Sequence, residues 1–304
     1  MIGGSQEQEK KKPMLDRRAR RTLTAYLFIL PVLVLLAVFV FGPVLFTFFI
    51  SFFKWDFFTP PVFVGISQYV ELFTQDQAFK TALYNNIWYT ILEVSMTIGI
   101  ALLLALGITE RSNVLRVVYF TPVITSTVAS ALIWKYMYEP HYGLINYVLD
   151  FFTLPTSSWL LDPRTSLLSI ALMDVWKGCG FYMMILLAGL KAIPSIYYDA
   201  ARTDGASTWQ QFKWVTIPLL KPTLLFVLIM SALGSFQVFT PVYMLTAGGP
   251  AFSSTTITFL IYKYAFNYFS MGRACAASVI LTIIVLAISV FQMRMLREGG
   301  MMEY

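Results

Sequence analysis

Six apolar stretches, each about as long as a membrane-spanning helix, constrain the fold of this chain more than any other feature. An α-helix needs about 20 apolar residues to cross about 30 Å of hydrocarbon, whereas transmembrane barrel strands are shorter and alternate in polarity. Only 12% of the side chains are charged, compared with about 25% in a soluble domain. The sequence therefore predicts an all-α membrane protein with six transmembrane helices, over residues 25–51, 86–108, 114–135, 166–190, 219–243 and 274–294.

The distribution of basic residues predicts the orientation of these helices. The first apolar stretch, residues 25–53, is too long for the apolar region of a cleaved signal peptide, so we expect a retained helix. Fifteen of the 22 Lys and Arg residues fall on one side of the predicted membrane, including seven in the basic tail, residues 1–24. Because cytoplasmic loops carry the excess of basic residues, we expect both termini, and the C-terminal tail at residues 295–304, in the cytoplasm.

Several functional classes are disfavoured by what the chain contains. Cys179 and Cys275 lie in or beside apolar segments, which favours helix packing over a disulfide. His141 is the single histidine and lies in a loop, so neither a metal site nor an intramembrane enzyme is expected. The net charge of +6 follows from the topology signal and does not indicate a nucleic-acid partner.

The segment Asp199–Pro218, DAARTDGASTWQQFKWVTIP, interrupts the apolar stretches with a punctuated polar pattern. Its capping and turn residues predict a short helix, a sharp glycine turn and a second short helix that ends before Pro218. The residues that carry this pattern are Ser195 as N-cap of Ile196–Thr203, Gly205 in the turn, and the capping-box pair Ser207 and Gln210 before a helix over 208–216.

Small side chains in this segment would let another surface approach its backbone. Asp199 and Arg202 flank the small residues with charge, and Trp209 and Phe212 can face back towards the membrane bundle. Two interpretations remain open from the residues alone: a loop that merely joins two spans, or a docking element for a cytoplasmic partner. The small residues are Ala200, Ala201 and Ala206.

This segment resembles the EAA loop of ABC importer permeases over twenty positions without a gap. The pattern EAA, two residues, DGA, five residues, F, two residues, I, one residue, LP is matched with Asp199 for Glu, Val215 for Ile and Ile217 for Leu. Further stretches resemble the sugar-type permeases of the maltose and glycerol-3-phosphate systems. They are Asn85-Asn86, WKYMYEPHYGLIN (134–146), LAGLKAIP before the loop, LTAGGP (245–250), Thr255 and IYKYAF.

The resemblance implies a type I importer permease, with a core over residues 82–294 and the coupling loop over 191–218. It implies a second, similar permease subunit, two cytoplasmic ATPase subunits and an extracytoplasmic solute-binding protein, in a bacterial or archaeal inner membrane. The chain has no G-x-x-x-x-G-K-[ST] loop, so ATP and Mg²⁺ are expected in the partner ATPase. The residues implied to contact that ATPase are Asp199, Ala200, Ala201, Arg202, Asp204, Gly205 and Ala206.

Polar groups within spans are costly and are therefore candidates for contact with the solute. In the fourth span, aromatic faces could stack on sugar rings and Lys177 could donate hydrogen bonds, or the lysine could snorkel and the glycines serve packing. In the fifth span, the resemblance places solute contacts on the face that carries Ser231 and Ser235. The candidates are Trp176, Lys177, Gly178, Phe181, Ser231, Gly234, Ser235 and Val238.

Glu93 is an acid in the second span, for which we expect pairing inside the bundle. A proton-coupled secondary transporter that uses Glu93 and Lys177 as a relay is the alternative function, although such transporters are built from internal repeats that this chain lacks. The sequence leaves open whether the solute is an oligosaccharide, a monosaccharide, a glycoside or a glycerol phosphate.

Overall fold

The computed structural model describes residues 15–108 and 113–298, which divide into two units at Phe49 and Ile50. The first unit is a helical segment: α1 (Leu15–Leu36), one π-helical turn (Ala37–Phe41) and α2 (Gly42–Ile50). Its apolar part, Thr24–Ile50, agrees with the predicted first span. Pro43 supplies no N–H to the preceding turn, which accounts for the wider turn just before it.

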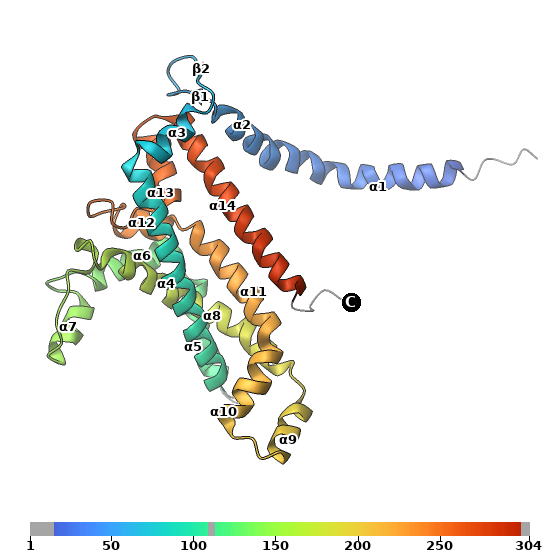
Figure 1. Cartoon of the computed structure of the whole chain (residues 1–304), viewed down its shortest axis with the longest axis vertical. Coiled ribbons are helices and arrows are strands. Elements are labelled where there is room, and N and C mark those ends of the chain that lie inside the picture. Colours follow the sequence, from blue (N-terminus) through green and yellow to red (C-terminus); the bar gives the residue numbers. More distant parts are fainter. Residues whose placement is uncertain (1–14, 109–112, 299–304) are drawn as a thin grey trace, which may run out of the picture. The chain divides into compact units, whose positions relative to one another are not determined.

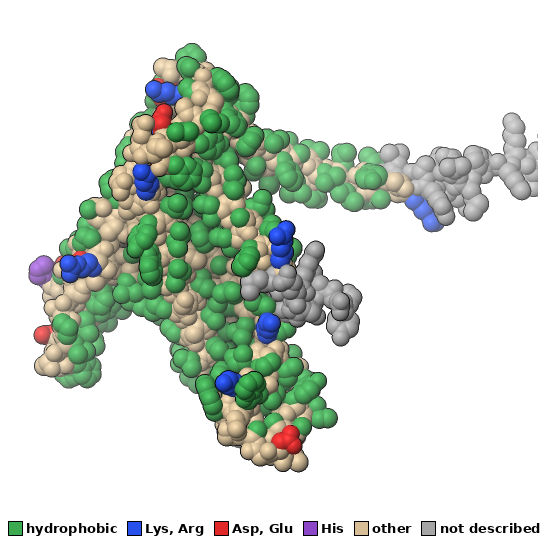
Figure 2. Space-filling view, viewed as in Figure 1, with side chains coloured by type: hydrophobic (Ala, Val, Ile, Leu, Met, Phe, Trp, Pro, Cys, Tyr) green, Lys and Arg blue, Asp and Glu red, His purple; other side chains and the backbone are tan. Residues whose placement is uncertain are grey.

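The second unit contains four long helices and a bent pair (Figure 1). In length and composition, α4 (Gln77–Gly107), α8 (Ser166–Lys191), the helix over Thr208–Phe236 and α14 (Met271–Glu298) can each cross a membrane. With the first unit this makes five spans, or six if the bent pair α5 (Asn113–Ile124) and α6 (Thr127–Met137) is one. Hydrophobic side chains cover most of the face seen in Figure 2, as expected for helices in lipid.

Shorter elements connect the long helices on the side opposite the polar loop, which is the segment between α8 and α11 (Ile217–Phe236) that contains Asp199–Pro218. A two-stranded antiparallel hairpin is the exception to the all-α prediction, with Phe53 paired to Phe63 and Lys54 to Val62. Its strands are β1 (Phe53–Lys54) and β2 (Val62–Phe63), and the other connecting elements are α3 (Ser67–Thr74), α7 (Leu144–Phe151), a 3₁₀ turn (Trp159–Leu161), α12 (Thr240–Leu245), α13 (Ile257–Tyr262) and a π turn (Lys263–Asn267).

Three buried clusters follow one another along α4 and hold the second unit together. Phe79 lies in a cluster with α13 and α14, Tyr89 in one with α6, α8 and α12, and Ala101 in one with α8 and α11 (Ile217–Phe236). Because α4 contributes to all three, it is the common wall against which the other helices pack. This arrangement fixes the faces of α8 and α11 that lie opposite α4.

Two predicted spans begin or end elsewhere than expected. The second was predicted from residue 86, but α4 begins at Gln77, because the Asp76 side chain accepts a hydrogen bond from the Phe79 N–H (3.0 Å) and caps the helix. The fifth was predicted over 219–243, but α11 ends at Phe236 and α12 is separate. Pro241 in the first turn of α12 cannot continue a preceding helix.

The third predicted span, 114–135, is broken rather than continuous. Its two halves, Val114–Ile124 and Thr127–Met137, meet at an angle of 98°. Pro122 removes one intrahelical hydrogen bond from the last turn of α5, and Ser126 is the N-cap of α6. The bend leaves backbone carbonyl groups without helical partners inside an apolar region, where unsatisfied groups are costly.

Candidate functional site

A central cavity of ≈ 230 Å³ lies between α4, α8 and the end of α11. The surrounding helices are apolar, yet most of the side chains around the cavity carry polar or charged groups. A polar cavity within a helical bundle is a usual place for a solute site. The cavity is lined by Tyr89, Glu93, Asp174, Lys177, Gly178, Tyr182, Ser231, Gly234, Ser235 and Val238.

Two carboxylates reach this cavity from facing helices. Asp174 on α8 accepts a hydrogen bond from the Tyr89 hydroxyl on α4, which ties the two helices together at this level. Glu93 is buried one turn further along α4, and its Oε1 accepts a hydrogen bond from the Thr97 hydroxyl (2.9 Å). Glu93 is therefore paired inside the bundle, as expected, and its partner Thr97 lies four residues away on the same helix.

Lys177 links the cavity to the bend between α5 and α6. Its Nζ donates hydrogen bonds to the carbonyl oxygens of Pro122 (3.2 Å) and Thr125 (2.5 Å), which lie at the broken end of α5. A cation at a helix C-terminus is favourable because the carbonyl dipoles point towards it. Lys177 therefore adds charged donors at the bend, where the Pro122 carbonyl also accepts from the Thr125 N–H and hydroxyl.

The face of α11 that lines the cavity offers hydroxyl oxygens and open space. Ser231 Oγ donates to the Leu228 carbonyl (3.3 Å) and Ser235 Oγ to the Ala232 carbonyl (3.0 Å), so both hydroxyl protons are used within the helix. A Cβ atom built on Gly234 would have no heavy atom within 4 Å. Both hydroxyls are thus left as acceptors towards the cavity.

The cavity brings together most of the solute-contact residues predicted from the sequence and adds others. Phe181 does not line it, and Trp176 lies on the other side of α8. Sequence reasoning missed Tyr89, Asp174 and Tyr182; an acid three residues before Lys177 was the available signal for Asp174. The predicted residues that do line it are Lys177, Gly178, Ser231, Gly234, Ser235 and Val238.

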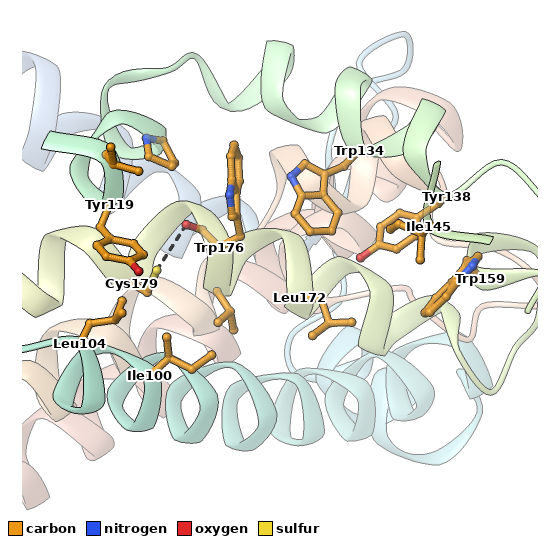
Figure 3. A pocket seen from close by; sticks show the side chains of 13 residues that line it. Ile100, Leu104, Tyr119, Trp134, Tyr138, Ile145, Trp159, Leu172, Trp176 and Cys179 are labelled. Carbon is orange, nitrogen blue, oxygen red and sulfur yellow. Dashed lines mark hydrogen bonds between the residues drawn. The ribbon is translucent and has the colours of Figure 1, made fainter. Parts of the chain in front are cut away.

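Trp176 belongs to a separate apolar groove of ≈ 580 Å³ beside α5 and α6 (Figure 3). Its ring packs against Trp134 at 5.6 Å, Trp134 packs against Tyr138 at 5.3 Å, and Tyr138 against Trp159 at 5.4 Å. These rings pack on one another, and the groove has few polar atoms to receive sugar hydroxyls. Cys179 also lines the groove, and both it and Cys275 are free thiols, as the packing interpretation expects.

Replacing Lys177 by methionine is expected to destabilise the folded subunit. Methionine keeps much of the length of the side chain but cannot donate to the Pro122 and Thr125 carbonyls. The loss should be about 1–3 kcal/mol, because hydrogen bonds to a charged group are removed. Thermal unfolding of the purified protein in detergent measures this effect. Lys177→Arg keeps the donors and should retain most of the stability; equal melting temperatures for Lys177→Met and wild type would contradict the role of Lys177 in the bend.

At the end of the bundle away from the β1–β2 hairpin, the polar loop forms α9 (Ser195–Thr203), the Gly205 turn and α10 (Thr208–Gln211) (Figure 1). The Ala206 N–H bonds to the Ala201 carbonyl (2.9 Å) and the Gly205 N–H to the Arg202 carbonyl (3.0 Å), the pattern of a Schellman C-cap. Gly205 has φ +76°, as the turn requires. The predicted glycine turn is confirmed.

The prediction for the second helix of the loop is correct at the start of the helix and wrong at its end. Both bonds of the capping box are present: the Ser207 N–H donates to Gln210 Oε1 (2.7 Å) and the Gln210 N–H donates to Ser207 Oγ (3.4 Å). However, α10 continues through a π-helical turn, Phe212–Thr216, into α11 rather than ending before Pro218. The wider turn accommodates the missing N–H of Pro218, so the loop is continuous with the membrane helix that lines the cavity.

The first helix of the loop presents an exposed surface, with the large side chains of Ile196 and Tyr197 near its start and the small ones of Ala200 and Ala201 after them. The helix has no buried residue, and its N-cap is Pro194 rather than the predicted Ser195. Asp199 and Arg202 form an exposed ion pair at 3.2 Å. Trp209, expected to face the bundle, is 68% exposed and instead packs its ring on Phe212, because α10 projects beyond the apolar helices that could cover it.

Comparisons with known proteins agree with this geometry. The family described as "Binding-protein-dependent transport system inner membrane component" matches residues 78–297. The chain is 36% identical to the probable ABC transporter permease protein YurN of Bacillus subtilis over 282 residues, 90% of this chain and 96% of that protein. It is 35% identical to the trehalose/maltose transport system permease protein MalF of Thermococcus litoralis, again over 90% of this chain and 94% of that protein.

A solved structure shows the same fold. The crystal structure of a bacterial alginate ABC transporter in complex with an alginate pentasaccharide-bound periplasmic protein contains a chain that superposes with a TM-score of 0.80. The two chains are 22% identical, and the match covers 94% of this chain and 98% of that one.

Proposed function

The chain belongs to the binding-protein-dependent transport system inner membrane components, and from this premise we propose that the central cavity is where its solute crosses the membrane. It is a permease subunit of an ATP-driven importer for a sugar or sugar-like solute, and is itself a transport subunit, not an enzyme. Its fold is that of a type I ABC importer permease. The observation that carries the proposal is the polar lining of the cavity between α4, α8 and α11.

The solute contacts of this subunit come from three helices, α4, α8 and α11, and α4 fixes the faces of the other two. Hydroxyl oxygens of Ser231 and Ser235 and the carboxylates of Glu93 and Asp174 are acceptors for the hydroxyl groups of a sugar. Gly178 and Gly234 leave room for a ring close to the backbone. The names of relatives that transport trehalose and maltose support a solute of this class.

The coupling role of the polar loop is also part of the proposal. An exposed, capped helix with small side chains at Ala200 and Ala201 fits a groove on a cytoplasmic ATPase, and the unbroken passage from α10 into α11 would carry its movement to the cavity. The contact set is the one implied by the resemblance, including Asp204, Gly205 and Ala206. ATP and Mg²⁺ belong to that partner, since the chain contains no phosphate-binding loop of the G-x-x-x-x-G-K-[ST] type.

Other partners and the topology complete the proposed assembly. The chain is a multi-pass protein of the cell membrane and acts with the partner types of an ABC importer. We place a second permease subunit beside it, an ATPase subunit under each permease and a solute-binding protein outside, with both termini in the cytoplasm as the basic residues favour. The tail up to residue 14, Arg111 and residues 299–304 lie outside the described residues.

The domain assignment rests on the sequence: a tail over 1–24, a first helix over 25–53, a permease core over 82–294 and a C-terminal tail over 295–304. Proton-coupled secondary transport, the alternative, receives no support from the relatives, which carry the names of ABC transporter permeases.

Filling the cavity tests the proposed solute site. Gly234→Trp adds a large side chain where a Cβ meets open space, so we expect the subunit to fold and assemble while solute uptake into cells falls by at least about tenfold. Leu103→Trp, on the exposed face of α4 and outside the cavity, is the control and should leave uptake near wild type. Normal uptake by a correctly assembled Gly234→Trp transporter would rule out this cavity as the solute site.

A further inference from the structure

The central cavity has an excess of carboxylates that packing does not explain. Glu93 is 7% exposed, and its Oε2 has no hydrogen-bond partner within the described part of the chain. A buried carboxylate oxygen without a donor is costly, so such an atom in a cavity marks a position for a donor on a ligand. Asp174 lines the same cavity, and its Oδ2 already accepts from Tyr89.

The cation that lines this cavity is partly engaged at the bend between α5 and α6, and its charge interacts with that of Asp174 rather than Glu93. Lys177 is the lining residue with a positive charge, and two of its three N–H donors are held by the Pro122 and Thr125 carbonyls. The serine hydroxyls donate within α11. Among the described side chains that line the cavity, acceptors and negative charge therefore exceed free donors and positive charge.

We propose that Glu93 is a specificity-determining residue for the charge of the transported solute. Its free Oε2 accepts a hydrogen bond from a hydroxyl or ammonium group of a neutral or amino sugar. Together with Asp174 it excludes solutes that carry a carboxylate, sulfonate or phosphate group, because like charges brought together away from water repel strongly. The inference rests on the proposed function, since it requires the cavity to receive the solute.

Glucose, glucosamine and glucuronate serve as probes. Glucosamine and glucuronate each differ from glucose at one carbon, where they carry an ammonium and a carboxylate group respectively. Binding is measured by saturation-transfer difference NMR on the whole transporter in nanodiscs, without the binding protein, so that only sites in the membrane assembly contribute. We expect glucose and glucosamine to bind the wild type, and glucuronate to bind at least about tenfold more weakly.

Matched variants assign this selectivity to Glu93. Glu93→Gln keeps the size of the side chain and removes its charge, so glucuronate binding should rise towards that of glucose, whereas glucosamine should bind more weakly. Asp150→Asn removes an exposed acid on α7, outside the cavity, and should change none of the three affinities. The same shift in both variants would indicate a long-range charge effect and would overturn the role of Glu93.

The outcomes separate this inference from the function on which it rests. If Gly234→Trp removes the glucose and glucosamine signals but the wild type binds glucuronate equally well, the charge selectivity is wrong and the cavity remains the solute site. If Gly234→Trp leaves the signals unchanged, the probes bind elsewhere and the proposed site itself fails. Absence of glucose and glucosamine binding to the wild type also overturns the inference, because a cavity rich in acceptors should receive these donors.

Discussion

Valine in place of Gly205 is expected to abolish ATP-driven uptake while the subunit still inserts into the membrane. The residue has φ +76°, a conformation that costs a β-branched side chain at least about 1–2 kcal/mol, and its turn sets the angle between α9 and α10. A Cβ there meets no atom of this chain within 4 Å, so the added methyl groups would face the ATPase. We expect the affinity for the ATPase subunits to fall by more than about tenfold.

Co-purification of the ATPase subunits with the tagged variant, and uptake by the same cells, measure this effect. Gly205→Asn separates the two physical causes, because asparagine tolerates the left-handed conformation but still adds a side chain. Loss of binding in both variants indicates that the bare surface matters; loss with valine alone indicates that the backbone turn matters. Full binding and uptake by Gly205→Val would contradict the docking role.

Alanine in place of Gly180 is expected to prevent stable folding. A Cβ at this position would lie 2.0 Å from the Tyr119 carbonyl oxygen and 2.8 Å from its carbon, both backbone atoms of α5 that cannot rotate away. Since α5 ends at the bend that Lys177 holds, its displacement would also disturb the cavity. We expect a destabilisation of at least about 3 kcal/mol, seen as a loss of monodisperse protein and of its thermal transition.

A glycine two residues earlier provides the control for this substitution. A Cβ on Gly178 meets only the edge of the Tyr182 ring, at 3.8 Å, so Gly178→Ala should change stability by about 1 kcal/mol or less. Both substitutions change helix propensity equally, which leaves the close contact with α5 as the difference between them. Equal stability of the two variants would show that α5 and α8 are not in this contact.

Much of the fold could be predicted because single segments carry their own signals. The apolar stretches are long enough to identify spans, and Gly205, Ser207 and Gln210 specify the turn and the second helix of the polar loop through local hydrogen bonds. These bonds join residues at most five positions apart, so no tertiary information is needed. The same holds for the serine face of α11, whose spacing alone places Ser231 and Ser235 together.

The bend of the third span could not be predicted in this way. Pro122 is a weak signal, because Pro31 and Pro222 also lie inside helices that continue past them. The 98° bend is held partly by local hydrogen bonds of Thr125 and partly by the ammonium group of Lys177, more than fifty positions away on α8. Packing between distant segments therefore decides whether a proline ends a helix.

Asp174 was missed, and Glu93 was recognised but not placed at the cavity, for a related reason. Helices α4 and α8 carry apolar residues around most of their circumference, so periodicity does not say which face meets the other. The Tyr89–Asp174 hydrogen bond follows only once the two helices are packed together. A polar residue in a span can be recognised from the sequence, but its neighbours across the bundle cannot.

Access to the central cavity tests the whole account most directly. The variant Gly234→Cys, combined with Cys179→Ala and Cys275→Ala, leaves one cysteine in this subunit. Its accessibility can be measured with a membrane-impermeant maleimide in right-side-out vesicles that contain the complete transporter. Because a transporter must expose its solute site to one side at a time, we predict labelling in one of two states, nucleotide-free or trapped with vanadate, and protection in the other. Equal labelling in both states, or none in either, would contradict the placement of this cavity on the solute pathway.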